Sequence, residues 1–395
     1  DARLLTMRHT DQIYHPEGPA SRAAWTSRAE ELRRQVLVAA GLWPRPEKTP
    51  LNPRIFGRTE RDGYTVEKVH FESYPGFLVA GNLYRPRGME GPFPAVLAPH
   101  GHWAKGRTHD TERGSVPARA INLARQGYVV LAWDMVGYGD TRQVSHDFAA
   151  DSLSSMWGIN LLGLQLRNSL RALDLVRSLP EVDTSRIGIT GASGGATQAF
   201  LLTAVERGRR IDVSAPVNMI SVRMQGGSLC ENALGLRLGT NNVELAALTA
   251  PRPMLMVANT HDWTVSTPTV EYPAMQRYYE LFGAGDRLEF AYFDFPHNYN
   301  RASRNAMYPF FARHLKGAAD PASYREQPYE PLEDEELLVF LKQAITDPSR
   351  TYDEIPDSLH RSLPTEMDAA ALKDQLKDRW RGQLESYWPS DSESR

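Results

Sequence analysis

The sequence predicts an α/β fold, in which a mostly parallel, twisted sheet carries helices on both faces. Between about residue 93 and residue 315, short apolar runs alternate with amphipathic stretches. One of these runs, at residues 186–190, leads straight into a glycine-rich turn and a further helical stretch. Short apolar strands that alternate with helices are typical of a parallel sheet covered on both sides.

The N-terminal part of the chain precedes this alternation. Residues 20–41 carry an apolar stripe that ends at Gly41, and they predict a helix. Residues 42–54 contain four prolines and predict an extended crossing segment. Two alternating runs, at residues 64–71 and 77–84, predict a hairpin that supplies the first two strands of the sheet.

The elements of the core follow in order along the chain. Strands are expected at residues 93–98, 128–133, 186–190, 213–220, 253–258 and 288–295. Helices are expected at residues 118–126, 161–179, 196–206, 272–282 and 305–315, with further helical stretches at 333–344 and 369–384.

The pattern predicts three parts. We expect residues 1–60 to form a helical and extended segment that packs on the core. Residues 61–317 form the catalytic domain, with an insertion at about 221–245. Residues 318–395, rich in charge and proline, form a C-terminal extension that packs on the core or mediates association.

Composition excludes several classes of partner. Lys and Arg number 45 and Asp and Glu 48, so the net charge of −3 gives no basic field for nucleic acid or an anionic membrane. No apolar run approaches the roughly 18 residues that span a bilayer. The single cysteine, Cys230, excludes a multi-cysteine zinc site, and we expect a small buried hydrophobe there. Because the sequence begins with Asp1, we favour a bacterial periplasmic or secreted location, and the oligomeric state is open.

The most specific motif is a nucleophile turn. Gly191-Ala192-Ser193-Gly194-Gly195 is the only G-x-S-x-G sequence in the chain, and it lies between a predicted strand and a predicted helix. In such a turn a strained serine is exposed at the end of a strand, and small neighbours let strand and helix approach closely. We predict that Ser193 is a nucleophile.

A serine nucleophile needs a base, which in this chain order follows the last core strand. His297 lies there, in the string P-H-N-Y-N, and is the predicted base. His261 and His314 are the competitors. An acid is expected after the preceding strand, where it fixes the imidazole tautomer.

Asp262 occupies the predicted position of the acid, in the string T-H-D-W. Asp294 is the runner-up, because it is close to His297 in sequence but lies along a strand. Asp286 and Glu231 are weaker alternatives.

Two backbone N–H groups are expected to stabilise an oxyanion. One belongs to Gly194, which follows the nucleophile. The other belongs to His102, in the P-H-G-H-W loop after the strand at 93–98. The alternative is a metal site at His100, His102, His109 and Asp110; we expect no metal, because the His-Gly pair lies where an oxyanion loop belongs.

Together these motifs resemble the α/β-hydrolase superfamily. Residues 20–316 are similar to bacterial hydrolases of the acetyl xylan esterase-like and prolyl-oligopeptidase-like branch, several of which are carbohydrate esterases acting on plant cell-wall polysaccharides. The resemblance implies a Ser193–His297–Asp262 triad, an oxyanion hole at Gly194 and His102, and no cofactor. It does not extend to residues 318–395.

Other residues are candidates for substrate binding. Tryptophans that can stack on sugar rings are Trp103, Trp157 and Trp263, and Tyr138 is expected to shape the floor of the site. The insertion carries Arg223, Glu231 and Arg237, and a guanidinium matches the carboxylate of an anionic sugar.

These features predict a serine esterase that cleaves a small acyl or methyl ester on a plant cell-wall carbohydrate. An acetyl xylan esterase-like and a pectin or uronate methyl esterase-like activity both stay open. The alternatives are a peptidase or amidase of the prolyl-oligopeptidase-like type, and a non-catalytic binding protein on the same fold.

Overall fold

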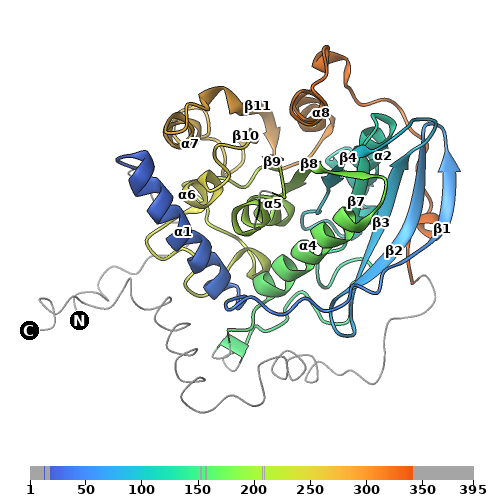
Figure 1. The fold of residues 1–395 in the computed structure, drawn as a ribbon, viewed down its shortest axis with the longest axis horizontal. Helices are drawn as coiled ribbons and strands as arrows, with labels where there is room; N and C mark the ends of the chain where they lie inside the picture. The colour runs from blue at the N-terminus through green and yellow to red at the C-terminus, as the bar shows by residue number, and fades with distance from the viewer. Residues whose placement is uncertain are drawn as a thin grey trace, which may run out of the picture.

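A nine-stranded, mostly parallel sheet organises the computed structural model of the chain (Figure 1). The structure describes residues 13, 18–151, 154–155, 158–206, 208 and 210–340. The strand order is β1-β2-β3-β7-β4-β8-β9-β10-β11. Strands β1, β2, β3 and β7 pair antiparallel, and from β7 to β11 every pairing is parallel. The predicted fold class is confirmed.

Each core strand and core helix that the sequence predicts has a counterpart close to its expected position. The strands of the sheet are β1 (Arg54–Arg61), β2 (Tyr64–Tyr74), β3 (Phe77–Pro86), β4 (Phe93–Leu97), β7 (Val129–Trp133), β8 (Val182–Ala192), β9 (Val213–Val217), β10 (Met254–His261) and β11 (Leu288–Pro296). The α-helices are α1 (Arg22–Ala39), α2 (Val116–Arg125), α4 (Leu161–Ser178), α5 (Gly194–Val205), α6 (Asn242–Ala247), α7 (Glu271–Glu280), α8 (Arg301–Lys316) and α9 (Asp334–Leu337). A small separate hairpin joins β5 (Asp110–Thr111) and β6 (Gly114–Ser115), and 3-10 turns lie at Gly106–Thr108 (η2), Leu229–Glu231 (η3), Gly285–Arg287 (η4) and Pro321–Ser323 (η5).

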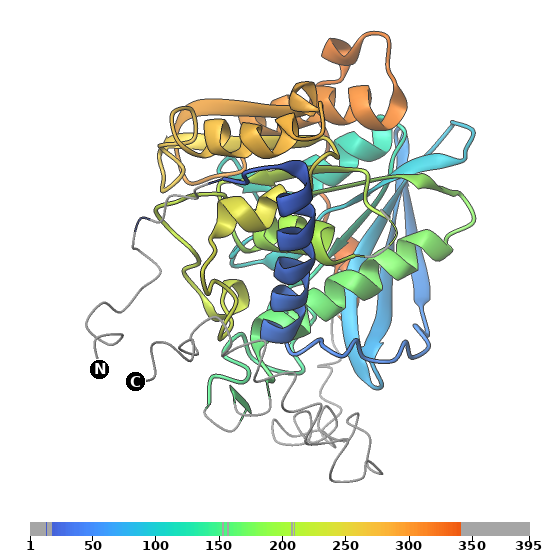
Figure 2. The same ribbon diagram turned by 60° about the vertical axis from the view of Figure 1, so that its left-hand side comes forward.

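Helices cover both faces of the sheet, so the apolar residues form two cores (Figures 1 and 2). The larger core takes side chains from α1, α4, α5 and α7, for example Leu32, Leu166 and Phe200. The smaller one takes them from α2 and α8, for example Ile121 and Phe311. Because both faces of the central strands are buried, these strands read as continuous apolar runs rather than as alternation.

The N-terminal helix packs on the domain. A strand that was not predicted follows it. Trp25 of α1 contacts Tyr278 of α7 edge to face, with 4.5 Å between ring centroids. The predicted hairpin is confirmed as β2 and β3, but the expectation that it supplies the first two strands is wrong. Strand β1 pairs with β2 and forms the edge of the sheet. Its sequence, RIFGRTER, is rich in charge because an edge strand faces solvent, and this charge hides the strand pattern.

The described part of the C-terminal extension packs on the core. Arg304 of α8 is buried and holds Glu326 with two hydrogen bonds of 2.5 and 2.8 Å. Of the helix predicted at residues 333–344, only α9 is helical among the described residues: the chain leaves the helix at Leu338, so the prediction is wrong for residues 338–340. Residues 341–344 and the stretch at 369–384 lie outside the described residues. In the part of the chain that the structure describes, no helix is long and apolar enough to cross a membrane.

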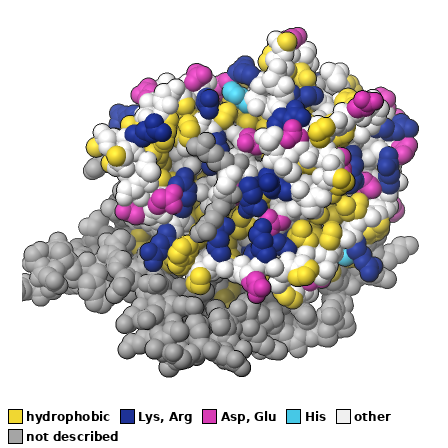
Figure 3. All heavy atoms as spheres, viewed as in Figure 1, with side chains coloured by type: hydrophobic (Ala, Val, Ile, Leu, Met, Phe, Trp, Pro, Cys, Tyr) yellow, Lys and Arg dark blue, Asp and Glu magenta, His cyan; other side chains and the backbone are white. Residues whose placement is uncertain are grey.

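Charges of both signs cover the surface. On the face shown in Figure 3, basic and acidic side chains are interspersed with apolar ones. This distribution agrees with the net charge of −3.

A buried arginine joins three separate parts of the fold. The guanidinium of Arg107 in η2 donates to Asn82 Oδ1 of β3 (2.7 Å), to Asp140 (2.7 Å) and to the carbonyl of Leu337 in α9 (2.8 Å), and it pairs with Asp134 after β7. Neither Arg107 nor Asp134 has an exposed side chain. Burial by itself raises the pKa of Asp134, but the attraction of Arg107 and hydrogen bonds outweigh it and hold that pKa below its usual value.

We expect Arg107→Met to destabilise the fold by about 3–5 kcal/mol, because it leaves a buried carboxylate without its partner. The low pKa of Asp134 contributes stability above about pH 4, and that contribution is lost as the pH falls through the folded-state pKa. The difference in free energy of unfolding between the wild type and Arg107→Met therefore becomes smaller at acid pH. Urea denaturation at several pH values measures this free energy. Arg58→Met is the matched control: Arg58 pairs with Glu60 on the surface, with side chains 54% and 50% exposed, and its loss should cost less than about 1 kcal/mol. Equal losses for both variants would contradict the prediction.

Candidate active site

Ser193 occupies the sharp turn between β8 and α5. Its backbone has φ 55° and ψ −124°, a conformation that a residue with a side chain rarely adopts. Its N–H donates to the carbonyl of Val217 at the end of β9 (3.1 Å), and its carbonyl accepts from Thr197 in α5. The strained backbone is thus held from the neighbouring strand and from the helix that follows.

The glycines of the motif are required by close packing. A Cβ at Gly191 would lie 2.6 Å from the Gly195 backbone and 2.7 Å from the carbonyl oxygen of Pro99. A Cβ at Gly195 would lie 2.7 Å from the carbonyl oxygens of Pro99 and His100. Since real Cβ atoms do not approach so closely, only glycine lets β8, α5 and the loop after β4 meet around Ser193.

His297 and Asp262 lie together at the ends of the last two strands. The distance from His297 Nδ1 to Asp262 Oδ2 is 3.3 Å, and the Asp262 side chain is fully buried. Asp262 also accepts from the backbone N–H of Trp263 (2.7 Å) and from the hydroxyl of Thr264 (3.1 Å). The Trp263 ring packs on the imidazole with 4.4 Å between centroids. These contacts fix the carboxylate and the orientation of the ring.

The competing residues are engaged elsewhere. His261 pairs with Asp294 (3.2 Å), and both side chains are mostly exposed, at 70% and 83%. Asp294 also accepts from the Thr260 hydroxyl (2.5 Å). His314, on α8, lies 3.8 Å from Glu289. Asp262 is therefore the carboxylate that contacts His297.

Asparagine and tryptophan side chains tie the strand ends to one another. Asn218, after β9, has φ 54°; its side chain donates to the carbonyl of Asn298 (2.9 Å), and its own carbonyl accepts from the Trp263 indole (3.1 Å). The backbone of Ser193 is hydrogen-bonded to Val217. These contacts together link the loops after β8, β9, β10 and β11. Asn218 is not recognisable from the sequence, because an asparagine by itself indicates no more than tolerance of a positive φ.

The loop after β4 lies against the turn that carries Ser193. A Cβ at Gly101 would lie 3.3 Å from Ser193 Cβ, and one at Gly194 would lie 3.0 Å from His102 Cε1. The two proposed oxyanion donors, Gly194 and His102, are therefore neighbours. Trp103 stacks on His109 (5.0 Å between centroids), and Tyr138 contacts the His102 ring edge to face (6.2 Å).

The insertion between β9 and β10 carries two arginines with different surroundings. Arg237 donates from all three guanidinium nitrogens, to Asn242, to Asn232 and to the carbonyl of Glu231, at 2.7–2.9 Å. Its contacts lie within its own segment. Arg223 is exposed, and its guanidinium Nε donates to the Ser266 hydroxyl (3.3 Å). Of the two arginines, Arg223 is the one that solvent reaches.

Glu231 and Cys230 are buried beside His102. Cys230 Sγ lies 3.1 Å from His102 Nε2, and Glu231 Oε1 lies 3.8 Å from His102 Nδ1. Burial, with the imidazoles of His146, His100 and His297 nearby, lowers the pKa of His102 to about 4. Burial raises the pKa of Glu231, and burial with the nearby Glu231 charge raises the pKa of Cys230 to about 12. Cys230 is buried in the larger apolar core as expected, and its sulfur also contacts His102 and the Ser228 hydroxyl.

The residues of the alternative metal site weighed above, His100, His102, His109 and Asp110, have their side chains engaged separately. His100 is fully buried, with Nδ1 donating to the carbonyl of Gly101 (2.6 Å) and Nε2 accepting from the Met135 N–H (2.9 Å). His109 stacks on Trp103 and contacts the Thr111 hydroxyl instead. Trp157, one of the tryptophans singled out above, lies outside the described residues.

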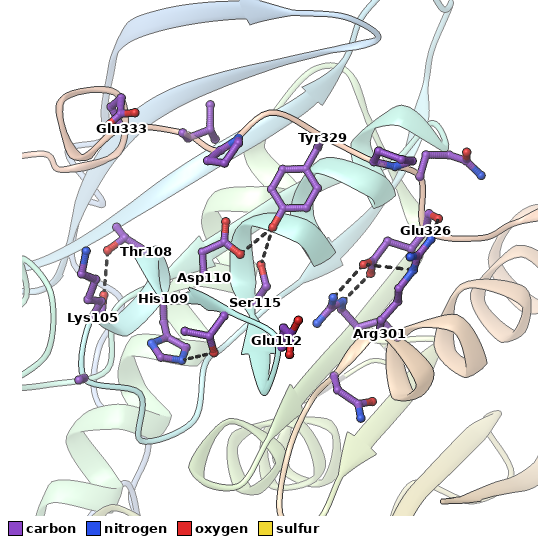
Figure 4. Close-up of a pocket in the computed structure, with 18 of the residues that line it drawn as sticks. Lys105, Thr108, His109, Asp110, Glu112, Ser115, Arg301, Glu326, Tyr329 and Glu333 are labelled. Carbon is purple, nitrogen blue, oxygen red and sulfur yellow. Dashed lines mark hydrogen bonds and ion pairs between the residues drawn. The ribbon is translucent and has the colours of Figure 1, made fainter. Parts of the chain in front are cut away.

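A cleft lies apart from these residues. It has a volume of about 1270 Å³ between the β5–β6 hairpin and residues 326–335, and neither Ser193, His297 nor Asp262 lines it. In Figure 4, Tyr329 points toward Asp110 and Ser115, to which its hydroxyl is bonded at 2.6 and 3.2 Å. The β5–β6 hairpin also contacts the loop that carries His297, because Arg113 donates to the carbonyl of His297 (2.9 Å).

Comparisons with known proteins extend this description. Residues 48–217 match the family model of acetyl xylan esterase (AXE1). YtaP, a protein of Bacillus subtilis (strain 168) named as a hydrolase, is 27% identical over 247 residues, which cover 59% of this chain and 81% of YtaP.

Solved structures show the same relationship. The methylesterase BT1017 superposes with a TM-score of 0.67 and 30% identity, covering 92% of this chain and 78% of its own. A family 15 glucuronoyl esterase from Caldicellulosiruptor kristjansonii superposes with a TM-score of 0.53 at 16% identity, covering 85% of this chain and 98% of its own, which is evidence of the fold alone. With the sheet, the turn at Ser193 and these matches together, the chain belongs to the acetyl xylan esterase (AXE1) family, a family of carboxylic ester hydrolases with the α/β-hydrolase fold.

Proposed function

We propose that the protein is a serine esterase that cleaves the methyl ester of a sugar carboxylate through a Ser193–His297–Asp262 triad. The observation that carries the proposal is the strained Ser193 at the end of β8. His297 and Asp262, which are paired, follow the ends of β11 and β10 on the same side of the sheet. A serine held in this way needs a base whose second nitrogen is free, and the pairing supports His297 in that role.

The tautomer of His297 decides which of its nitrogens can act as the base. Asp262 accepts the Nδ1 proton of His297, so Nε2 is left as the base. Ser193 Oγ attacks the ester carbonyl while Nε2 takes its proton, and the N–H groups of Gly194 and His102 stabilise the oxyanion. Nε2 then protonates the departing methoxide, methanol leaves, and the sugar acyl group stays on Ser193. Water, activated by the same imidazole, releases the free carboxylate.

Similarity and surface both support a sugar carboxylate. The methylesterase with 30% identity spans 92% of this chain, more than the matched family model does. Arg223 is exposed on the insertion, and Trp263 packs beside His297. A guanidinium and an aromatic ring suit the charged edge and the apolar face of a uronate chain.

An acetylated sugar is the second candidate. The family model that matches residues 48–217 is that of acetyl xylan esterase. In that reaction the sugar hydroxyl is the leaving group and the acetyl group stays on Ser193. The same residues would act, but the sugar would lie on the alcohol side of the ester and not on the acyl side.

We expect methanol release from methyl-esterified pectic oligosaccharides to exceed acetate release from acetylated xylan at equal ester concentration. The purified chain is incubated with each, and methanol and acetate are assayed separately, with aryl esters from acetate to octanoate as a third series. Activity on the aryl esters should fall steeply toward octanoate. Acetate as the main product would favour the second candidate, a maximum at octanoate would contradict the carbohydrate assignment, and hydrolysis of aryl amides at the rate of esters would point to an amidase.

A further inference from the structure

Two histidines and the single cysteine meet beside the nucleophile turn. His102 comes from the loop after β4, His146 from the loop after β7, and Cys230 from η3. One nitrogen or sulfur atom of each lies within 4.8 Å of the others. We propose that His102, His146 and Cys230 bind a thiophilic divalent cation and that Zn²⁺ is the ion suited to this donor set.

The tautomer of His146 prepares it for a metal. Its Nδ1 lies 2.6 Å from the carbonyl oxygen of Val136, and because a carbonyl only accepts, Nδ1 carries the proton. Nε2 of the neutral ring then has its lone pair available. This atom is buried, and among the described residues it has no hydrogen-bond partner. Donation of Nδ1–H to a backbone carbonyl is the arrangement found in metal-ligating histidines.

His102 has the complementary arrangement with a carboxylate. Its Nε2 faces the cluster, 3.1 Å from Cys230 Sγ, and its Nδ1 lies 3.8 Å from Glu231 Oε1. Glu231 is held in place by the N–H of Gly227, which donates to Oε2 (2.7 Å). At 3.8 Å the carboxylate is near the ring without a hydrogen bond to it; a shift of a few tenths of an ångström would bring it to the position from which a carboxylate orients a ligating imidazole.

The donor set and its spacing favour zinc over hard cations. Zn²⁺ forms bonds of about 2.0–2.1 Å to nitrogen and 2.3 Å to sulfur, so its tetrahedral ligand atoms stand roughly 3.3–3.8 Å apart. The observed span, from 3.1 Å up to 4.8 Å, brackets that range. Imidazole and thiolate bind Mg²⁺ and Ca²⁺ poorly. On binding, the Cys230 thiol loses its proton to solvent as the Zn–S bond forms, and the fourth position is open to water or to Ser228 Oγ, 3.0 Å from the sulfur.

The location joins the site to the nucleophile turn. A Cβ at Gly194 would lie 3.0 Å from His102 Cε1 and 3.5 Å from Cys230 Sγ. A bound ion would thus hold the loop that carries His102 against the residue after Ser193. The binding proposal does not depend on which ester is cleaved, because its test measures the metal itself.

The test uses the full chain without a histidine tag, stripped with a chelator and then equilibrated with Zn²⁺. We expect one Zn²⁺ per chain by elemental analysis, and Co²⁺ in its place should show the absorption of a thiolate-to-cobalt charge transfer. Cys230→Ser and His146→Gln should each weaken binding by more than the roughly 10–100-fold that loss of an outer partner costs. The Co²⁺ thiolate absorption should disappear in Cys230→Ser.

His314→Gln is the matched control, since it removes an imidazole that lies on α8 beside Glu289 and should leave Zn²⁺ affinity unchanged. Thermal melts establish that each variant is folded, and if Cys230→Ser does not fold, His146→Gln decides. Failure of the wild type to retain Zn²⁺, a Co²⁺ complex without thiolate absorption, or equal affinity in wild type and His146→Gln would each overturn the proposal. The cluster would then be a neutral hydrogen-bonded group.

Discussion

Ser193→Ala is expected to lower kcat by roughly a millionfold while leaving the fold intact. The substitution removes the attacking oxygen, and the small side chain keeps the backbone of the turn, where Gly191 and Gly195 already meet neighbouring carbonyls. His297→Ala should be about as damaging. Because the two residues act as a unit, the double variant should be little worse than either single one. Initial rates on the best substrate, with active-site titration of the wild type, measure the loss.

Ser323→Ala is the control for that experiment, since its exposed hydroxyl in η5 bonds only to the carbonyl of Asp320 among the contacts described. Its rate should equal that of the wild type. Wild-type activity in Ser193→Ala would remove Ser193 from the reaction. Loss in the double variant equal to the product of the two single losses would show that His297 acts separately from Ser193.

Asp262→Asn is expected to lower kcat by about 10⁴-fold. An amide at this position can donate to His297 Nδ1, which would place the proton on Nε2 and leave Ser193 without a base. The packing of Trp263 on the imidazole and the hydrogen bond from Thr264 should keep the geometry unchanged. Measuring kcat and KM separately tests this reasoning, because a tautomer effect lowers kcat with little change in KM.

Asp294→Asn is the matched control. Asp294 is much closer to His297 in sequence than Asp262 is, but its carboxylate contacts the Thr260 hydroxyl and His261 and is mostly exposed. Its rate should change less than about threefold, since a surface pair contributes little. If Asp294→Asn were the inactive variant, or if Glu231→Gln and not Asp262→Asn lost activity, the acid would have to be reassigned.

Local patterns determined the sheet and the candidate catalytic residues. A parallel strand must end at the same edge as its neighbours, so the position of a residue just after a strand predicts where it lies. Ser193, Asp262 and His297 each follow such a strand directly. Their arrangement could therefore be expected from chain order alone, as could the glycines that flank Ser193.

Strand β1 was missed for a local reason. Its charged residues suit an edge exposed to solvent, so the alternation that marks a half-buried strand is absent. Pairing with β2 decides its conformation, and pairing is a property of the folded chain. The contacts of Arg107 also depend on the folded chain. Its sequence neighbours do not indicate that its partners lie on β3, after β7 and on α9.

Tertiary structure alone decided the cluster of His102, His146 and Cys230. The alternative metal site that the sequence offered, and that was set aside, included His100 and His109; in the fold these two residues make a buried backbone contact and stack on Trp103. Cys230 lies 128 residues from His102, and no local pattern records that η3 returns to the loop after β4. The sequence by itself determined which residues stand at strand ends, because strand direction and period are local properties. Which loops meet above those ends depends on side-chain packing between distant segments, and only the folded chain decides it.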